Sequence, residues 1–334
     1  SAASDVYKRQ EMDNILIDGL EYVNWNRDLF EKAHAGGITA IHATLVYWED
    51  THESFEKMNY WDNLIQSNSD ILMHVKKSSD ILLAKETNKV GIIYGFQNSA
   101  PIANDIFLIE KFFLRGLRFM QLTYNNQTPL AGGCYEKNDS GVSRFGEMVI
   151  EEMNRLGMIV DLSHAGRQTC LDTINLSKTP VAISHANPNF FHKSIRNIDD
   201  DVLKKLANKN GFIGLSVYPY HLKNHGDCKL EDFCDMIKQL INMIGEDNIG
   251  IGSDLCVNWP DDVVMWMRNG KWTKKIDYGE SQDKNANWPK PASWYSKPED
   301  LSSFLTGMIS NGINEKTANK IAGKNWFNFM TNHF

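Results

Sequence analysis

Three side chains that can bind a metal stand at the ends of three apolar runs. His164 ends "DLSH", His185 follows the run in "AISHANP", and Asp254 ends "GIGSD". Two imidazoles and a carboxylate are a ligand set for a divalent metal, most often zinc. A single histidine at a strand end is usually just a packed polar residue. Two in consecutive runs, together with the aspartate, predict a metal site.

The rest of the chain alternates apolar runs of strand length with amphipathic helical stretches. Helical patterns cover residues 26–37, 143–158, 199–211, 229–247 and 314–330. The apolar runs are residues 14–19, 38–45, 89–96, 117–124, 158–164, 180–186, 211–218 and 248–254. Eight strand–helix units predict an α/β protein with a (β/α)8 TIM barrel, and a doubly wound open sheet is the alternative. In both folds functional side chains lie at the carboxyl ends of the strands.

Composition excludes several classes of protein. A net charge of −7 over 334 residues argues against nucleic-acid binding, which needs a basic surface. No apolar run approaches the roughly 18 residues of a membrane span. The five scattered cysteines form no CxxC pair, which predicts reduced thiols and a cytoplasmic location. Residues 1–10 carry no periodic pattern, so we predict a non-native remnant there and a single barrel domain over residues 11–334.

Residues 257–300 break the rhythm of the chain. They are rich in Trp, Pro and Lys and follow the last apolar run without a clear period. Long loops of this kind are more often functional than idle. We interpret the segment as a lid or rim over the barrel mouth, and a contact between subunits is the alternative.

Four motifs occur in order: "EEMNRLGMIVDLSHAG", "PVAISHANP", "RNIDDDVL" and "IGIGSDL". Together they resemble the membrane (renal-type) dipeptidase family, peptidase family M19, a branch of the metal-dependent amidohydrolase-like barrels. The resemblance extends from about Ile15 to the final "GKNWFNFM". It implies a (β/α)8 barrel, usually a homodimer, with two zinc ions bridged by a glutamate. A metal-activated water there attacks the peptide carbonyl of a dipeptide.

The resemblance also implies roles for individual residues. His164 and His185 match the two histidine ligands of one zinc ion. Arg196, in "SIRNIDDD", matches the arginine that holds the substrate's carboxylate, and bidentate guanidinium geometry suits that role. Asp254 matches the aspartate that handles the proton near the second metal.

Other positions depart from the family pattern. The first strand of the family ends Asp-Gly-His-x-Asp and binds the other zinc, but Leu20 and Tyr22 stand at the two ligand positions here. Leucine has no donor atom, and tyrosine would have to bind as phenolate, from a usual pKa of about 10. The bridging glutamate is replaced by Gln97, and a substrate-contacting histidine by Tyr124. Glu21 lies between the inward positions, so strand alternation turns it away from the axis.

Charge arithmetic limits the number of metal ions. Two dications about 3.5 Å apart repel by roughly 19 kcal/mol at an effective dielectric of about 20. The inward set of His164, His185, neutral Gln97 and Asp254 holds one carboxylate, which cannot offset that repulsion. We therefore predict one metal at most, zinc, held by the two histidines and completed by Gln97 or Asp254. Cys256 is a less favoured fourth ligand, because a small buried thiol is usually structural.

The leading hypothesis is a metal-dependent hydrolase acting on a dipeptide or a similar small amide-bearing acid. Asp254 would carry the proton, Arg196 would hold a carboxylate, and Tyr124 would contact the substrate and donate to the developing oxyanion. A barrel that only binds a small molecule or a partner is the alternative. A metal-free enzyme using His and Asp is the third hypothesis.

Other tempting residues are predicted to be structural. His42 lies within a strand run and is expected to be packed or hydrogen-bonded. His221 and His225 lie in "HLKNHGDC", for which we predict a solvated loop. Residues 134–136 follow the fourth run at the barrel mouth, and the sequence does not show which of them points inward.

Overall fold

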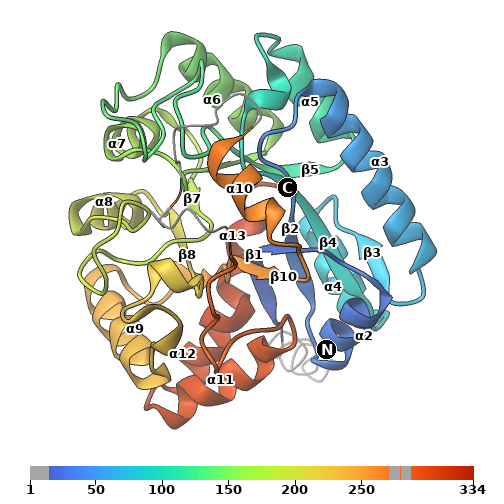
Figure 1. Ribbon diagram of the computed structural model, residues 1–334, viewed down its shortest axis with the longest axis vertical. Helices are drawn as coiled ribbons and strands as arrows, with labels where there is room; N and C mark the ends of the chain where they lie inside the picture. Colours follow the sequence, from blue (N-terminus) through green and yellow to red (C-terminus); the bar gives the residue numbers. More distant parts are fainter. Residues whose placement is uncertain (1–14, 271–278, 280–286) are drawn as a thin grey trace, which may run out of the picture.

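Eight parallel strands close into a barrel in the computed structural model, which describes residues 15–270, 279 and 287–334 (Figure 1). Neighbouring barrel strands pair in chain order, and the last pairs with the first at Asp18 and Ile251. Each predicted apolar run overlaps one barrel strand, so the TIM barrel is confirmed. The prediction for residues 1–10 lies outside the described residues. The barrel strands are β1 Ile17–Val23, β2 Ala40–Val46, β4 Val90–Phe96, β5 Leu117–Gln121, β6 Ile159–Asp161, β7 Ala182–Ile183, β8 Phe212–Leu215 and β9 Ile249–Ile251.

Two further strands extend the sheet without joining the ring. β3 (Leu72–His74) pairs with the first half of β4, and β10 (Leu255–Val257) pairs with the second half of β1. Each has three residues, which is too short for a periodic signal in the sequence.

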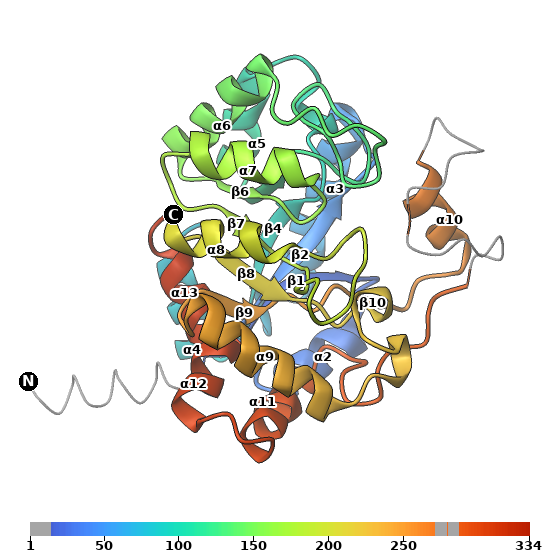
Figure 2. The same cartoon turned by 90° about the vertical axis from the view of Figure 1, so that its left-hand side faces the viewer.

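Helices surround the barrel (Figures 1 and 2). They begin and end with ordinary signals: the Ser143 side chain accepts from Gly146 N at 3.0 Å before α6, and Gly157 ends α6 at a φ of 80°. Within the described ranges, none of them is long and apolar enough to cross a bilayer. The helices are α2 Arg27–Ala35, α3 Thr51–Ser67, α4 Ser78–Glu86, α5 Phe107–Leu114, α6 Arg144–Leu156, α7 Arg167–Leu176, α8 Asp200–Asn208, α9 Leu230–Ile244, α10 Asp262–Asn269, α11 Asp300–Ser310, α12 Glu315–Asn319 and α13 Asn325–Met330, with short turns at Ala100–Ile102, Pro219–His221, His225–Asp227 and Lys320–Lys324.

The prediction of a single helix over residues 314–330 is wrong in one respect. A π-helical turn divides this segment into α12 and α13. Gly323 lies in this turn, where a Cβ atom would stand 2.1 Å from the carbonyl oxygen of Ile15. The close approach brings the fully buried Trp326 against the first strand. Its Nε1 donates to Ile251 O at 2.7 Å, so α13 packs on the strands and covers one end of the barrel.

The described part of residues 257–300 contains helix α10, which the sequence did not predict. Figure 2 shows α10 at the opposite end of the barrel from α13. The Trp266 ring lies 4.6 Å from the Tyr47 ring, and Trp48 Nε1 donates to Met267 O at 3.0 Å. α10 therefore packs over the carboxyl ends of the strands, where a lid or rim was predicted.

Glu21 is a buried acid that lies close to a second buried acid, Asp18. It is 1% exposed. It interacts electrostatically with Asp18 and with Glu299 at the start of α11. Burial, and then the charge of Asp18, raise the pKa of Glu21 well above its usual value. A proton is therefore held in the folded chain that the unfolded chain would release.

We predict that Glu21→Gln stabilises the protein at neutral pH. Since the pKa of Glu21 is raised on folding, its contribution to stability is present below the unfolded pKa of about 4.3 and is lost as pH rises through the folded pKa. The variant should raise the free energy of unfolding by about 1–3 kcal/mol at pH 7. The gain should disappear near pH 4 in urea titrations. Glu86→Gln, at the exposed end of α4, is the control, and an equal gain at both pH values would contradict the prediction.

Candidate active site

Three donor atoms converge at the carboxyl ends of β4, β6 and β7. The Nε2 atoms of His164 and His185 lie 3.0 Å apart, and Gln97 Oε1 lies 3.0 Å from His164 Nε2. Two nitrogen ligands of a tetrahedral zinc ion are separated by roughly 3.3 Å, given zinc–nitrogen bonds of about 2.0–2.1 Å. The fold thus places three predicted ligands at a spacing close to that of a metal site.

The proton of His164 is on Nδ1. This atom lies 2.6 Å from Asn125 Oδ1, and an amide oxygen can only accept. Nδ1 therefore donates, and in the neutral ring Nε2 carries the lone pair. Asn125 is buried and was not chosen from the sequence, although it follows Tyr124 directly. Its amide oxygen fixes the tautomer and the orientation of the His164 ring.

His185 has the same tautomer for a different reason. Its Nδ1 lies 2.7 Å from Ser184 Oγ, and that hydroxyl donates to Asp161 Oδ2 at 2.5 Å. Because Ser184 Oγ already donates its only proton to Asp161, it must accept the hydrogen bond from His185 Nδ1. Asp161 is 1% exposed and was also missed. A carboxylate inside the apolar run "MIVDLSH" was the available signal.

Both imidazoles are neutral at the site. Burial, and then the positive charge of Arg196, lower the pKa of His164 and of His185 well below the usual value near 6.5. Gln97 Nε2 donates to Thr44 Oγ1 at 2.8 Å, which directs its Oε1 toward His164. The lone pairs of the two imidazoles and the amide oxygen of Gln97 therefore lie close together, an arrangement that attracts a cation.

Arg196 already brings positive charge to this point. It is 1% exposed, donates through one terminal nitrogen to Ser163 O, and through the other to His185 O at 3.2 Å. The second nitrogen also lies 3.4 Å from His164 Nε2. The structure thus places Arg196 beside both histidines, while its predicted contact with a substrate carboxylate stays a prediction.

The residues at the two first-strand positions, where the family pattern has ligands for the other zinc, do not suit a metal ion. Leu20 is buried in the core, and the Tyr22 hydroxyl accepts from Tyr47 Oη at 2.6 Å. Burial raises the pKa of Tyr22, so the phenolate form is disfavoured. Over the described residues, no three His, Cys, Asp or Glu side chains form a group that could hold a metal ion. Asp254 is thus not grouped with the two histidines, and Gln97 is the third donor beside them.

A small cavity of about 30 Å³ lies at the mouth. Five of the predicted site residues line it: Gln97, Tyr124, His164, Arg196 and Asp254. The Tyr124 ring covers His164 at 4.3 Å between ring centres. Asp254 has a φ of 54°, an unusual conformation for a residue other than glycine that often accompanies a functional constraint. Met267 of α10 contributes to the wall, so α10 closes the mouth.

The prediction of a solvated loop is wrong for His221. It is 1% exposed, its Nδ1 lies 2.8 Å from Ser216 Oγ, and it lines the mouth cavity. His225 is exposed, as expected. His42, as predicted, is packed inside the barrel, with Nδ1 2.6 Å from Gly19 O and its ring on Phe119. No sequence pattern distinguished His221 from His225, because only the fold turns one of them inward.

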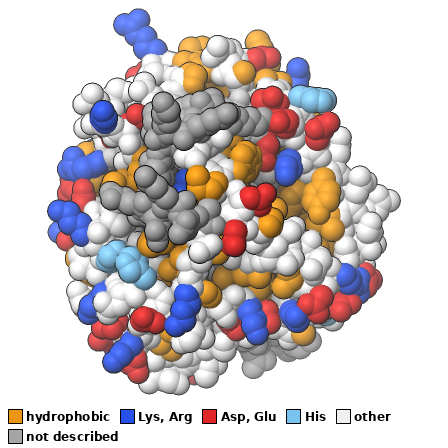
Figure 3. Space-filling model, in the orientation of Figure 1, with side chains coloured by type: hydrophobic (Ala, Val, Ile, Leu, Met, Phe, Trp, Pro, Cys, Tyr) orange, Lys and Arg blue, Asp and Glu red, His pale blue; other side chains and the backbone are white. Residues whose placement is uncertain are grey.

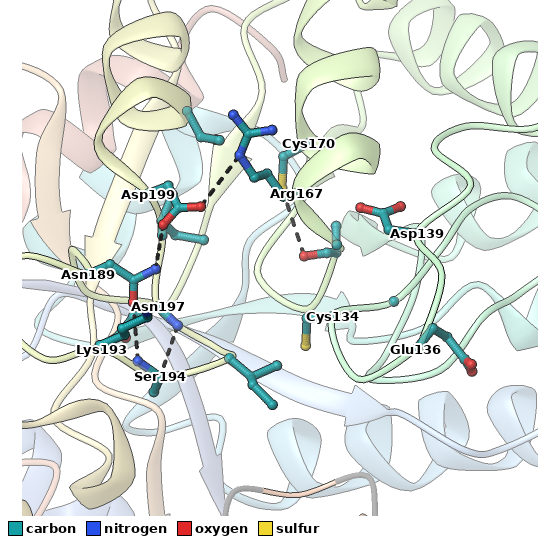
Figure 4. A pocket seen from close by; sticks show the side chains of 16 residues that line it. Cys134, Glu136, Asp139, Arg167, Cys170, Asn189, Lys193, Ser194, Asn197 and Asp199 are labelled. Atoms are coloured by element: carbon teal, nitrogen blue, oxygen red, sulfur yellow. Dashed lines mark hydrogen bonds and ion pairs between the residues drawn. The ribbon is translucent and has the colours of Figure 1, made fainter.

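Larger cavities lie around the mouth, and the largest of them, of about 740 Å³, shares Tyr22 with the mouth cavity and lies along α10. Two others contain cysteines. One, of about 290 Å³, contains Cys256, whose thiol lies 3.5 Å from Asp254 O and not at the histidines. The other, of about 500 Å³, is shown in Figure 4. Its charges are largely paired: Arg167 Nε lies 3.5 Å from Asp199, and Asp139 accepts from the first backbone N–H groups of α7. Cys134 and Glu136 both lie in its wall, and neither lines the mouth cavity.

Comparison with known proteins identifies the family. The family pattern of the membrane dipeptidases, peptidase family M19, matches residues 24–261. An uncharacterized dipeptidase of Schizosaccharomyces pombe is 29% identical over 60% of this chain and 50% of its own length. Dipeptidase aclJ of Aspergillus oryzae is 27% identical over 63% of this chain and 51% of its own. The chain thus spans about half the length of these curated relatives.

Solved structures agree with this result. The crystal structure of an amidohydrolase from Pseudomonas aeruginosa matches with a TM-score of 0.91 and 33% identity, covering 97% of this chain and 98% of that one. A metallopeptidase from Rhodobacter sphaeroides, crystallised with a phosphinate mimic of the dipeptide L-Ala-D-Ala, matches with a TM-score of 0.78 over 96% and 99% of the two chains. Its identity of 15% supports the fold alone. With its barrel, its motifs and this match over most of its length, the chain belongs to the membrane dipeptidase family, peptidase family M19.

Proposed function

We propose that the chain is a metal-dependent hydrolase of the dipeptidase type that uses a single zinc ion. Its substrate class is a dipeptide or a similar small amide-bearing acid. The observation that carries the proposal is the convergence of two neutral imidazole nitrogens and an amide oxygen beneath a closed mouth. The homodimer that the resemblance implies belongs to the same proposal.

The residues present fit one metal ion. His164, His185 and Gln97 would hold it through two nitrogens and one oxygen, donors that zinc accepts. When bound, such an ion lowers the pKa of a water molecule and polarises a carbonyl group. A second ion does not fit, because the first strand offers no donor and the set contains no bridging carboxylate.

The remaining mouth residues have separate roles in this proposal. Asp254 accepts a proton from the attacking water and passes it to the leaving amine. Tyr124 donates to the oxyanion that develops on the carbonyl. Arg196 holds the substrate's carboxylate, which requires its guanidinium to leave the backbone carbonyls that it now contacts. A dipeptide also requires α10 to move, because the mouth cavity of about 30 Å³ is far smaller than ordinary ligand pockets.

A metal-free binding barrel is the second candidate. One contact of Arg196 and one possible rotation of the Gln97 amide favour it. Arg196 supplies positive charge to His164 without a metal. Rotation of the Gln97 amide by 180° would turn Nε2 toward His164 and replace two facing lone pairs with a hydrogen bond. Metal-free acid–base chemistry with His221 or Asp254 would also need Arg196 beside His164 and the rotated Gln97 amide.

We expect close to one zinc ion per chain in protein purified without chelator. The double variant His164→Ala/His185→Ala should lose it, and His225→Ala, at an exposed histidine, should not. The zinc-loaded protein should release free amino acids from a dipeptide panel, and the double variant should not. Two ions per chain would contradict the charge argument. Zinc-free protein without hydrolysis would favour the binding barrel.

The role of Gln97 can be tested by its charge. Gln97→Glu should bind zinc at least about tenfold more tightly than the parent, because a carboxylate offsets the charge of the dication. Gln97→Leu should bind more weakly, and Gln66→Glu, on the exposed face of α3, controls for net charge. Competition with a chromophoric chelator measures the affinities. Equal affinities for the parent and both Gln97 variants would show that Gln97 is not a ligand.

A further inference from the structure

The cavity of about 290 Å³ beside the mouth, here called the side pocket, borders the mouth cavity. Tyr218 and Asp254 line both the side pocket and the mouth cavity, so these two side chains form the boundary between them. On the far side the pocket is closed by described residues of the segment after α10, including Trp288 and Tyr295. A molecule held at the mouth would reach the side pocket by passing between Tyr218 and Asp254.

The walls of the side pocket are largely apolar. Trp259, Trp288 and Tyr295 line it together with three prolines, and Asn258 and Ser296 add polar groups. The polar group of each ring is used elsewhere: Trp259 Nε1 donates to Tyr22 O at 3.1 Å, and Trp288 Nε1 to Pro260 O at 3.2 Å. The Tyr295 hydroxyl donates to Asp18 at 3.1 Å. What the walls offer a ligand is therefore mainly ring surface, which suits an aromatic or aliphatic group.

Charge gives the ligand a direction. Asp254 is the one charged side chain among the described residues that line the side pocket. It is fixed at the boundary by its left-handed backbone and by its N–H, which donates to Leu20 O at 2.9 Å. Arg196 is on the histidine side and lines only the mouth cavity of the two. A zwitterion would place its ammonium group toward Asp254 and its carboxylate toward Arg196.

We propose that the side pocket binds the side chain of the substrate's amino-terminal residue and selects aromatic and large aliphatic groups. This inference rests on the proposed dipeptidase function. In a dipeptide oriented by Asp254 and Arg196, the amino-terminal side chain is the one adjacent to the ammonium group. A volume of about 290 Å³ is at the lower end of ligand pockets, which suits one side chain and not a longer peptide.

Figure 3 shows hydrophobic side chains gathered near the centre of the face over which α10 lies, with acidic side chains beside them. The aromatic cluster of Tyr22, Tyr47, Trp48 and Tyr124 continues on this face into Trp259 and Trp288. The side pocket is thus one part of a continuous apolar rim.

Kinetics with the zinc-loaded full chain tests the inference. The kcat/KM for Phe-Gly should exceed those for Gly-Gly and Gly-Phe by about tenfold or more. Trp288→Ala should remove this preference, while Trp288→Phe, which keeps a flat apolar wall, should retain it. Tyr60→Ala, an exposed aromatic position on α3, is the matched control. Equal rates for the three dipeptides, or a preference for Gly-Phe, would overturn the inference and leave the hydrolase proposal intact.

A binding measurement separates the inference from the hydrolase proposal. L-phenylalaninol has an ammonium group and a benzyl group but no amide to hydrolyse, and ethanolamine lacks the benzyl group. Calorimetry should show at least tenfold tighter binding of phenylalaninol, reduced to the level of ethanolamine in Trp288→Ala. If this preference is found and no dipeptide is hydrolysed, the pocket stands and the hydrolase proposal fails. If neither amine binds better than the other, the pocket proposal fails whatever the kinetics.

Discussion

The buried carboxylate of Asp161 is the constraint on which the centre of this barrel depends. A charge taken out of water costs several kcal/mol unless hydrogen bonds replace its hydration. Asp161 accepts from the backbone and hydroxyl groups of both Ser163 and Ser184, and from Gln121. These donors come from β5, the end of β6 and the end of β7. Satisfying one charge thus fixes the relative positions of three strands and the tautomer of His185.

The sequence predicted the features that depend on local pattern. All eight barrel strands were identified, because buried parallel strands are continuous apolar runs, and α6 was identified from its cap and periodicity. His164 and His185 were placed together because parallel strands end at one rim, and Gln97 was added through the family resemblance. Asn125 and His221 were not found, since their roles depend on which way a loop turns. α10 was missed because its eight residues owe their position to contacts with Tyr47 and Trp48.

The first strand shows how packing has taken the place of charge. Where the family pattern has a histidine and an aspartate, Leu20 belongs to the core, and Tyr22 stacks on Trp259 at 4.6 Å. The Tyr22–Tyr47 hydroxyl pair satisfies the polar atoms of this cluster internally. Buried aromatic rings need no anionic partner, so the four departures from the pattern form a consistent set and not scattered losses.

The packing of Trp326 has a consequence for how the chain is made. Its ring lies against Gly19, Gly250 and Phe212, and its indole N–H bonds to Ile251, so the first strand and the last two barrel strands share one contact. During synthesis, none of these strands has that partner until residue 326 has left the ribosome. At a synthesis rate of about 5–20 residues per second, the apolar surface of β1 would stay uncovered for tens of seconds. Such a nascent chain is a natural client for chaperones that shield exposed hydrophobic segments.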